Sequence, residues 1–405
     1  MTTSLDTGTA ALPSPGVTAA AGFRASGITA GLKASGRPDL ALVVNDGPSQ
    51  AAAAVFTTNR VVGAPVVWSR QAVSDGVVSA VVLNSGGANV CTGPEGFLDV
   101  HLTAETVGAV LEISAGDVVV CSTGLIGERL PIDKILDGIG IAVEALSPEG
   151  GTDAAVAIMT TDTVAKTAHL HVDGDRGAWT VGGMAKGAGM LAPGLATMLC
   201  VITTDAVVDA ETADAALRAA VADTFERVDS DGCMSTSDTV TLMISGASRA
   251  IPDPAGFTAA LTQVCGELAR ALVADAEGAT HDIAVTVMGA ETQDAALAVA
   301  RAVTRSNLFK AAMFGNDPNW GRVLAQVGTV PESVAAFDPD QLDVTINGVQ
   351  VCKAGGAFRP RSEVDLAANR EVHVLIDLHA GGEVVTVWTN DLTHDYVHEN
   401  SAYST

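Results

Sequence analysis

A glycine-rich loop that runs directly into a short apolar segment constrains this chain more than any other feature. Residues 186 to 205 read Lys-Gly-Ala-Gly-Met-Leu-Ala-Pro-Gly-Leu-Ala-Thr-Met-Leu-Cys-Val-Ile-Thr-Thr-Asp. The glycines and Pro193 predict a loop, and the apolar run at 199–202 predicts a buried strand. Thr197 stands between the two, where a rigid element would hold its hydroxyl beside an open loop. Such places often carry catalytic groups, although a lone Thr at a strand start is more often a β-branched residue in a favourable position.

The charge balance narrows the classes of function. The chain of 405 residues carries 22 Lys and Arg against 47 Asp and Glu, a formal net charge of −25. Nucleic acids and anionic membrane surfaces repel such a protein, so neither is an expected partner. With 48% hydrophobic and 17% charged residues, the composition is that of a globular chain of two or three domains.

Two further patterns bear on location. No apolar run is long enough to span a bilayer, and no basic stretch precedes an apolar one near the N-terminus, so we expect neither a membrane span nor a signal peptide. The six cysteines form no Cys-x-x-Cys pair and lie mostly in apolar or glycine-rich surroundings. This pattern indicates reduced thiols in a cytoplasmic protein rather than a disulfide framework.

Strands alternate with helices along the rest of the chain, which predicts an α/β fold. Hydrophobic periodicity predicts helices over residues 102–113, 131–146, 212–228, 256–274 and 291–310. It predicts strands over residues 39–44, 51–56, 80–83, 118–121, 164–172, 199–202, 239–244, 283–287, 343–346, 371–376 and 383–388. The last ten residues are typical of a tail that would fray.

Polar turns follow two of these strands. Residues 84–89 contain two Asn and two Gly after a strand, which indicates a sharp turn or a close approach of the backbone. Thr123 and Gly124 lie between a predicted strand and a predicted helix, where backbone N–H groups could bind an oxyanion, although such turns are common. His169 and His171 share one face of a predicted strand, but no carboxylate or Cys cluster accompanies them, so we expect no metal.

Read together, several of these blocks resemble one known family. Lys186, the paired glycines and the run Ala196, Thr197, Met198 and Leu199 are similar to the self-cleaving block of the glutamate/ornithine N-acetyltransferase family. Further matching blocks follow in the family's order at 84–89, 122–127, 229–238 and 314–322, so the resemblance extends over residues 22–405. The sequence departs from the common pattern at Gly87, Cys233, Ser237 and His281, where the family often has Asn, Asp, Asn and Lys.

The resemblance implies a particular architecture. Two sheets are sandwiched between helix layers, the N-terminal-nucleophile-like α/β/β/α arrangement, and a second, smaller α/β domain follows. The implied division is a catalytic domain at 1–278 and a second domain at 279–405, whose C-terminal tail reaches the active site. Self-cleavage between Ala196 and Thr197 would give chains 1–196 and 197–405. These chains would stay associated, as a heterotetramer with two copies of each.

The resemblance also implies a reaction and its residues. The family transfers acetyl from N2-acetyl-L-ornithine to L-glutamate in arginine biosynthesis without a cofactor, and some members also accept acetyl-coenzyme A as donor. Thr197 would be the nucleophile, and its new α-amine, with an unperturbed pKa of about 7.7 to 8.0, would be the base that its hydroxyl needs. The oxyanion would be stabilised by Thr123 and Gly124. The implied substrate-binding residues are Thr160, Lys186, Thr197, Glu277, Asn400 and Thr405.

Two other classes of function fit the sequence less well. A self-processing amidohydrolase or aminopeptidase can share this architecture, and it would pass the acyl group to water. A binding protein that keeps the fold without catalysis would form no acetyl-enzyme. The presence of Lys186, Ala196 and Thr197 together disfavours the binding protein.

Overall fold

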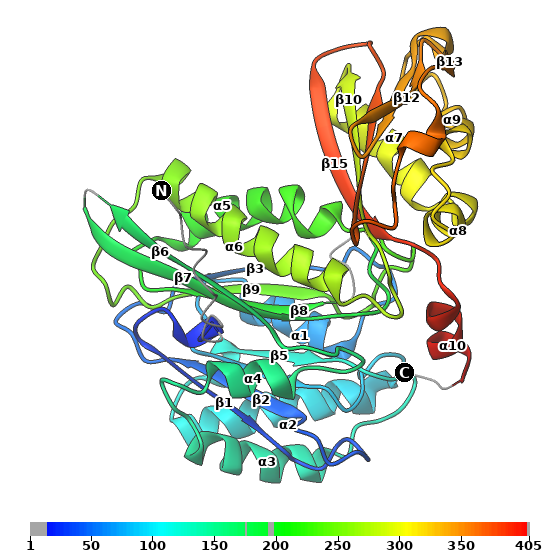
Figure 1. The fold of residues 1–405 in the computed structure, drawn as a ribbon. Coiled ribbons are helices and arrows are strands. Elements are labelled where there is room, and N and C mark those ends of the chain that lie inside the picture. The colour runs from blue at the N-terminus through cyan, green and yellow to red at the C-terminus, as the bar shows by residue number, and fades with distance from the viewer. Residues whose placement is uncertain (1–13, 175, 193–197, 403–405) are drawn as a thin grey trace, which may run out of the picture.

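Two β-sheets lie face to face in the larger part of the molecule (Figure 1). The computed structural model describes residues 14–174, 176–192 and 198–402. In spatial order, the four-stranded sheet contains β1 (Phe23–Ile28), β2 (Leu40–Asn45), β4 (Ala80–Asn84) and β5 (Val118–Ser122). The five-stranded sheet contains, in spatial order, β3 (Ala52–Phe56), β9 (Thr239–Ile244), β8 (Leu199–Thr204), β7 (Gly177–Lys186) and β6 (Lys166–Gly174).

The central strands are continuous apolar runs because both of their faces are covered. Every residue of β2, β4, β5, β8 and β9 is buried. Side chains such as Val43, Leu83 and Val201 fill the core between the sheets. Neighbours that point the other way, such as Leu42 and Ile202, pack in the outer cores. Strands buried on both faces read as unbroken hydrophobic stretches, which is why the sequence pattern predicted them.

Helices cover both outer faces of the sandwich (Figure 1). The four-stranded sheet is covered by α1 (Ala64–Ala72), α2 (Gly93–Leu111) and α3 (Ile132–Glu144). The five-stranded sheet is covered by α5 (Ala210–Asp223) and α6 (Pro254–Ala274). The short helix α4 (Gly151–Ala157) packs against β1 and β2. The predicted α/β/β/α sandwich is therefore confirmed.

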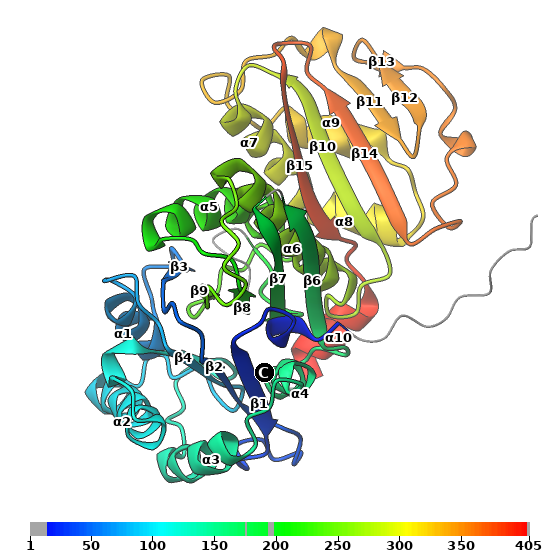
Figure 2. The ribbon, with the colours of Figure 1, turned by 90° about the vertical axis from the view of Figure 1, so that its left-hand side faces the viewer.

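A third sheet with its own core stands beside the sandwich (Figure 2). Its strands are, in spatial order, β13 (Gly356–Ala357), β12 (Val349–Lys353), β11 (Asp343–Ile346), β14 (Glu371–Asp377), β10 (Asp282–Ala290) and β15 (Glu383–Asn390). One face carries α7 (Gln293–Thr304), α8 (Asn307–Phe314) and α9 (Trp320–Val327). This is the smaller α/β unit that the sequence predicts, while the exact division between 278 and 279 stays a prediction.

The structure corrects two of the predicted elements. Residues 291–310 form two helices rather than one, because Ser306 interrupts the run and its hydroxyl accepts the Phe309 N–H at 3.2 Å as a cap for α8. The C-terminal segment, expected to be a tail, forms helix α10 (His394–Ala402), which runs back from the third sheet towards the sandwich (Figure 1). Thr393 anchors its start, since the hydroxyl accepts the Tyr396 N–H and donates to the Gly278 carbonyl. Within the described ranges, no helix is long and apolar enough to cross a membrane.

The five-stranded sheet contains strands from both sides of the predicted cleavage point. Residues 187–198 connect the antiparallel neighbours β7 and β8 in the sequence, and the Ala196–Thr197 bond falls among them. The strands that follow this bond, β8 and β9, lie side by side. They are flanked by β7 on one side and β3 on the other, both of which precede the bond.

Candidate active site

Six of the predicted site residues line one small inner pocket of about 90 Å³. They come from five separate parts of the fold: the turn after β5, the segment before β6, the end of β7, the segment after α6, and α10. The six are Thr123, Gly124, Thr160, Lys186, Glu277 and Asn400. The remaining predicted residues, Ala196, Thr197 and Thr405, lie outside the described residues.

The turn after β5 presents two hydrogen-bond donors to the pocket. The backbone N–H of Thr123 is occupied, since it donates to the Asn84 carbonyl at 3.0 Å. The Gly124 N–H has no acceptor among the described residues. Gly124 has φ of +126°, and an added Cβ would lie 2.9 Å from the backbone of Gly87, so only glycine fits there. The donors left for an oxyanion are therefore the Thr123 hydroxyl and the Gly124 amide.

A buried lysine lies directly beside this turn. Lys186, the last residue of β7, is 2% exposed, and its ammonium lies 3.2 Å from the Thr123 hydroxyl oxygen. An ammonium can only donate, so the hydroxyl accepts this bond and keeps its own proton for another acceptor. Burial lowers the pKa of Lys186, and the negative charge of Asp162 opposes that effect. The pair thus presents a positive charge and a hydroxyl donor at one corner of the pocket.

The opposite wall carries a carboxylate held by the C-terminal helix. Asn400 on α10 donates from Nδ2 to Glu277 Oε2 at 2.9 Å and to the Tyr396 carbonyl at 3.0 Å. Glu277 is 8% exposed, and its own N–H donates to the Ala188 carbonyl. A Cβ at Gly189 would lie 2.7 Å from Glu277 Oε1, so a glycine is needed for the loop to approach this carboxylate. The wall therefore offers a negative charge and an amide.

The start of β8 lies next to the pocket. Ser235 and Ser237 line it, and the neighbouring Asp238 accepts the N–H of Met198 through Oδ1 at 2.9 Å. Asp238 is completely buried, and its Oδ2 has no hydrogen-bond partner among the described residues. Burial is the main reason that the pKa of Asp238 lies well above its ordinary value. Burial thus favours the protonated form of this carboxyl, and Met198, which it holds, directly follows the predicted nucleophile in the sequence.

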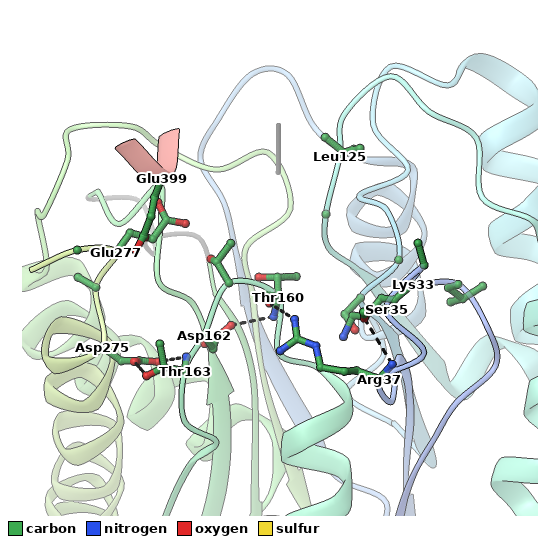
Figure 3. A pocket seen from close by; sticks show the side chains of 18 of the residues that line it. Lys33, Ser35, Arg37, Leu125, Thr160, Asp162, Thr163, Asp275, Glu277 and Glu399 are labelled. Atoms are coloured by element: carbon green, nitrogen blue, oxygen red, sulfur yellow. Dashed lines mark hydrogen bonds between the residues drawn. The ribbon is translucent and has the colours of Figure 1, made fainter. Parts of the chain in front are cut away.

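An outer cleft of about 810 Å³ (Figure 3) adjoins the inner pocket and shares Gly124, Thr160, Thr161 and Glu277 with it. Lys33 and Arg37 lie on one side of the cleft, and Glu277 and Glu399 lie on the other (Figure 3). Arg37 donates to the Thr160 carbonyl at 3.2 Å. Lys33 donates to two backbone carbonyls, and burial lowers the pKa of Lys33 to about 8.

Sequence reasoning missed several residues that shape the site. Asp162 and Asp238 accept hydrogen bonds from backbone N–H groups that are distant in the sequence, so no local motif pointed to them. Ser237 lines the inner pocket, whereas Cys233 is exposed. Of the two departures from the family pattern in this block, Ser237 therefore lies at the pocket and Cys233 does not line it.

Comparison with known proteins gives matches over almost the whole chain. The model of the ArgJ family matches residues 24–405. The arginine biosynthesis bifunctional protein ArgJ of Streptomyces avermitilis is 62% identical over 388 residues, which cover 96% of this chain and 99% of that protein. The protein of the same name from Mycobacterium leprae is 55% identical over 400 residues, which cover 97% of each chain. A solved structure of ornithine acetyltransferase with ornithine from Mycobacterium tuberculosis is 57% identical over 46% of this chain and 98% of that chain, with a TM-score of 0.43.

Proposed function

The chain belongs to the ArgJ family, and from this premise we propose that it transfers acetyl from N2-acetyl-L-ornithine to L-glutamate. The products are L-ornithine and N-acetyl-L-glutamate, in the biosynthesis of arginine. The observation that carries the proposal is the convergence of Thr123, Gly124, Thr160, Lys186, Glu277 and Asn400 on one pocket beside the start of β8. These residues come from distant parts of the sequence, and the resemblance assigned them to a single site.

The proposed chemistry is a ping-pong reaction through an ester on Thr197. The Thr197 hydroxyl attacks the acetyl carbonyl of acetylornithine while its α-amine accepts the hydroxyl proton. The resulting oxyanion accepts hydrogen bonds from the Thr123 hydroxyl and the Gly124 amide. Collapse of this intermediate breaks the amide bond, and the departing amine of ornithine takes the proton. The α-amine of glutamate then attacks the acetyl ester by the reverse sequence of steps.

The charges of the pocket suit a ligand that carries both signs. Acetylornithine has a carboxylate and a side-chain ammonium. Lys186 on one wall and Glu277 on the other supply the complementary charges. Thr160, Asn400 and Thr405 complete the proposed set of polar groups that place the amino acid.

Intact-mass spectrometry of the purified protein tests this function. We expect two fragments, 1–196 and 197–405, with Thr197 as the new N-terminus of the second. Acetylornithine should add the mass of one acetyl group to fragment 197–405, and glutamate should remove it. Thr197→Ala should remain one uncut chain that takes up no acetyl group. A wild-type protein that stays uncut while fully active would overturn the mechanism.

The same experiment separates the proposed transferase from a hydrolase. A self-processing amidohydrolase or aminopeptidase would release acetate from the acetyl-enzyme in water alone. We expect the acetyl group to persist until glutamate is added, and rapid loss without glutamate would favour the hydrolase.

We further propose that the two fragments remain together in the cytoplasm as a heterotetramer with two copies of each. The interleaving of their strands in the five-stranded sheet supports the association of one pair. Six free cysteines support a reducing compartment. Native mass spectrometry should show two copies of each fragment in one particle, and a particle with one of each would contradict the tetramer.

A further inference from the structure

Three charged side chains at the wall of the outer cleft, which adjoins the inner pocket, form a connected triad. The Lys166 ammonium lies 2.6 Å from Asp162 Oδ1 and 2.6 Å from Asp275 Oδ2. The side chains of Lys166, Asp162 and Asp275 are only 1%, 0% and 7% exposed. A lysine this deeply buried is rare unless its charge is paired, and here both carboxylates serve one ammonium.

The two carboxylates also hold backbone segments that carry the proposed substrate-binding residues. Asp162 Oδ1 accepts the Gly187 N–H at 2.7 Å, and Gly187 directly follows Lys186. Asp162 Oδ2 accepts the N–H of Thr160 itself at 2.9 Å (Figure 3). Asp275, two residues before Glu277, accepts the Thr163 N–H at 3.0 Å and the Thr163 hydroxyl. The triad thus joins the end of β7, the segment before β6 and the end of α6.

We propose that the Asp162–Lys166–Asp275 triad positions the residues of the inner pocket. The triad fixes Thr160, Lys186 and Glu277 relative to one another. It also places a surplus negative charge beside Lys186. The inference rests on the acetyl-transfer function proposed above. It assigns no contact with the substrate to the triad itself. Two carboxylates and one ammonium leave one negative charge over, and Lys186 is the buried cation that balances it.

The negative charge of Asp162 favours the cationic form of Lys186. Burial lowers the pKa of Lys186, and Asp162 is the largest of the charges that raise it. Asp162 and Glu277, together with Asp238 when it is ionised, favour the cationic form of Lys186, whereas Lys166 and Lys33 oppose it. Replacing Asp162 by a neutral residue therefore lowers the pKa of Lys186 further. An enzyme that needs a cationic Lys186 then loses activity at a lower pH than the wild type.

The test is the pH profile of kcat/KM for acetyl transfer from acetylornithine in Asp162→Asn. Asparagine keeps the shape of the side chain, but its amide nitrogen cannot accept a hydrogen bond from a backbone N–H. We expect kcat/KM at the optimum to fall by about 10- to 100-fold, the scale of a misplaced catalytic group. We also expect the alkaline limb of the profile to move to lower pH. Asp275→Asn also removes a negative charge from the triad, so it should move that limb in the same direction, but by less because Asp275 is not among the groups that act most strongly on Lys186.

A matched control separates positioning from stability. Asp205 is also buried, at the opposite end of β8 from Met198, and its carboxylate accepts the N–H groups of Ala21 and Thr180 at 3.0 and 2.8 Å. Asp205→Asn should lower the melting temperature as a buried Asp-to-Asn change does, yet leave the alkaline limb in place. If Asp162→Asn and Asp275→Asn keep the wild-type limb, or move it to higher pH, the positioning role is wrong.

Failure of the inference and failure of the proposed function give different results. If the wild type neither binds acetylornithine in a calorimetric titration nor transfers its acetyl group, the proposed function fails. If the wild type does both and the two triad variants behave like Asp205→Asn, the function stands and the inference alone is overturned. Should Asp162→Asn fail to fold, Asp275→Asn at the end of α6 still decides the direction of the shift.

Discussion

Thr123 shows how one hydroxyl can serve two groups of opposite charge. It accepts a hydrogen bond from the Lys186 ammonium and retains its own proton for the developing oxyanion. Removing one oxyanion donor costs about 10²- to 10³-fold in kcat, so Thr123→Ala should slow acetyl transfer by that factor. Thr123→Ser, which keeps the hydroxyl, should lose much less. Steady-state kinetics of the three proteins checks this, and an unchanged rate in Thr123→Ala would remove the residue from the site.

Asp238 gives a prediction on stability and pH. Its pKa in the folded protein is raised by burial above the unfolded value, so the folded state holds the extra proton between those two values. The contribution of Asp238 to stability must therefore fall as pH rises from the unfolded pKa of about 3.9. Asp238→Asn carries no such proton, and asparagine can still accept the Met198 N–H. Chemical denaturation at pH 4 and pH 8 should show the variant gaining relative to the wild type at the higher pH, and a constant difference would contradict the prediction.

The candidate site could be predicted from sequence only where a residue belongs to a local motif. Thr123 and Gly124 follow a strand that the sequence predicts, and Lys186 opens a glycine-rich block that is visible in the sequence. Asp162 could not be recognised in this way. Its partners are Gly187, 25 residues away, and Lys166, whose burial depends on how β6 packs against α6. A carboxylate that binds distant backbone groups leaves no periodic signal in the sequence.

At the scale of elements, close contact between a helix and a strand depends on a single glycine. An added Cβ at Gly27 in β1 would overlap the Asp153 carbonyl oxygen in α4. Gly27→Ala should therefore destabilise the protein by about 1–3 kcal/mol, as overpacked cores do. Gly140 in α3 has no atom near its would-be Cβ, and Gly140→Ala should stabilise the protein by about 0.4–1 kcal/mol. Thermal melts of the two variants should shift in opposite directions, and equal shifts would contradict this reading.

Glycines also explain why sequence analysis missed strand β7. β7 contains Gly182 and Gly183 in its middle, which are unfavourable in a strand and conceal its pattern. In the fold, Gly182 lies against the Gly16 carbonyl, where a Cβ would not fit. The apolar strands β2, β4, β5, β8 and β9 were predictable because each is buried on both faces. Helix α10 was missed because it has no buried residue and therefore no apolar stripe.

For the molecule as a whole, charge bears on the choice of acetyl donor. Acetyl-coenzyme A carries several phosphate charges, and basic side chains usually hold them. The chain has a net charge of −25, and the cations of the outer cleft already have protein acceptors: Lys33, Arg37 and Arg370. We therefore predict that acetylornithine is much the better donor. The measurement is kcat/KM for glutamate acetylation with each donor, and comparable values would overturn the prediction.

The strand order of the five-stranded sheet has a consequence for the reversibility of folding. Cutting the Ala196–Thr197 bond would leave β8 and β9 on one polypeptide, held between β7 and β3 of the other. The uncut precursor folds as a single molecule, whereas the cut pieces, once unfolded, must first find each other in solution. Refolding yield should then depend on protein concentration for the wild type but not for Thr197→Ala. The precursor could therefore refold after unfolding, whereas the lifetime of the cleaved protein would depend on the rate at which it first unfolds.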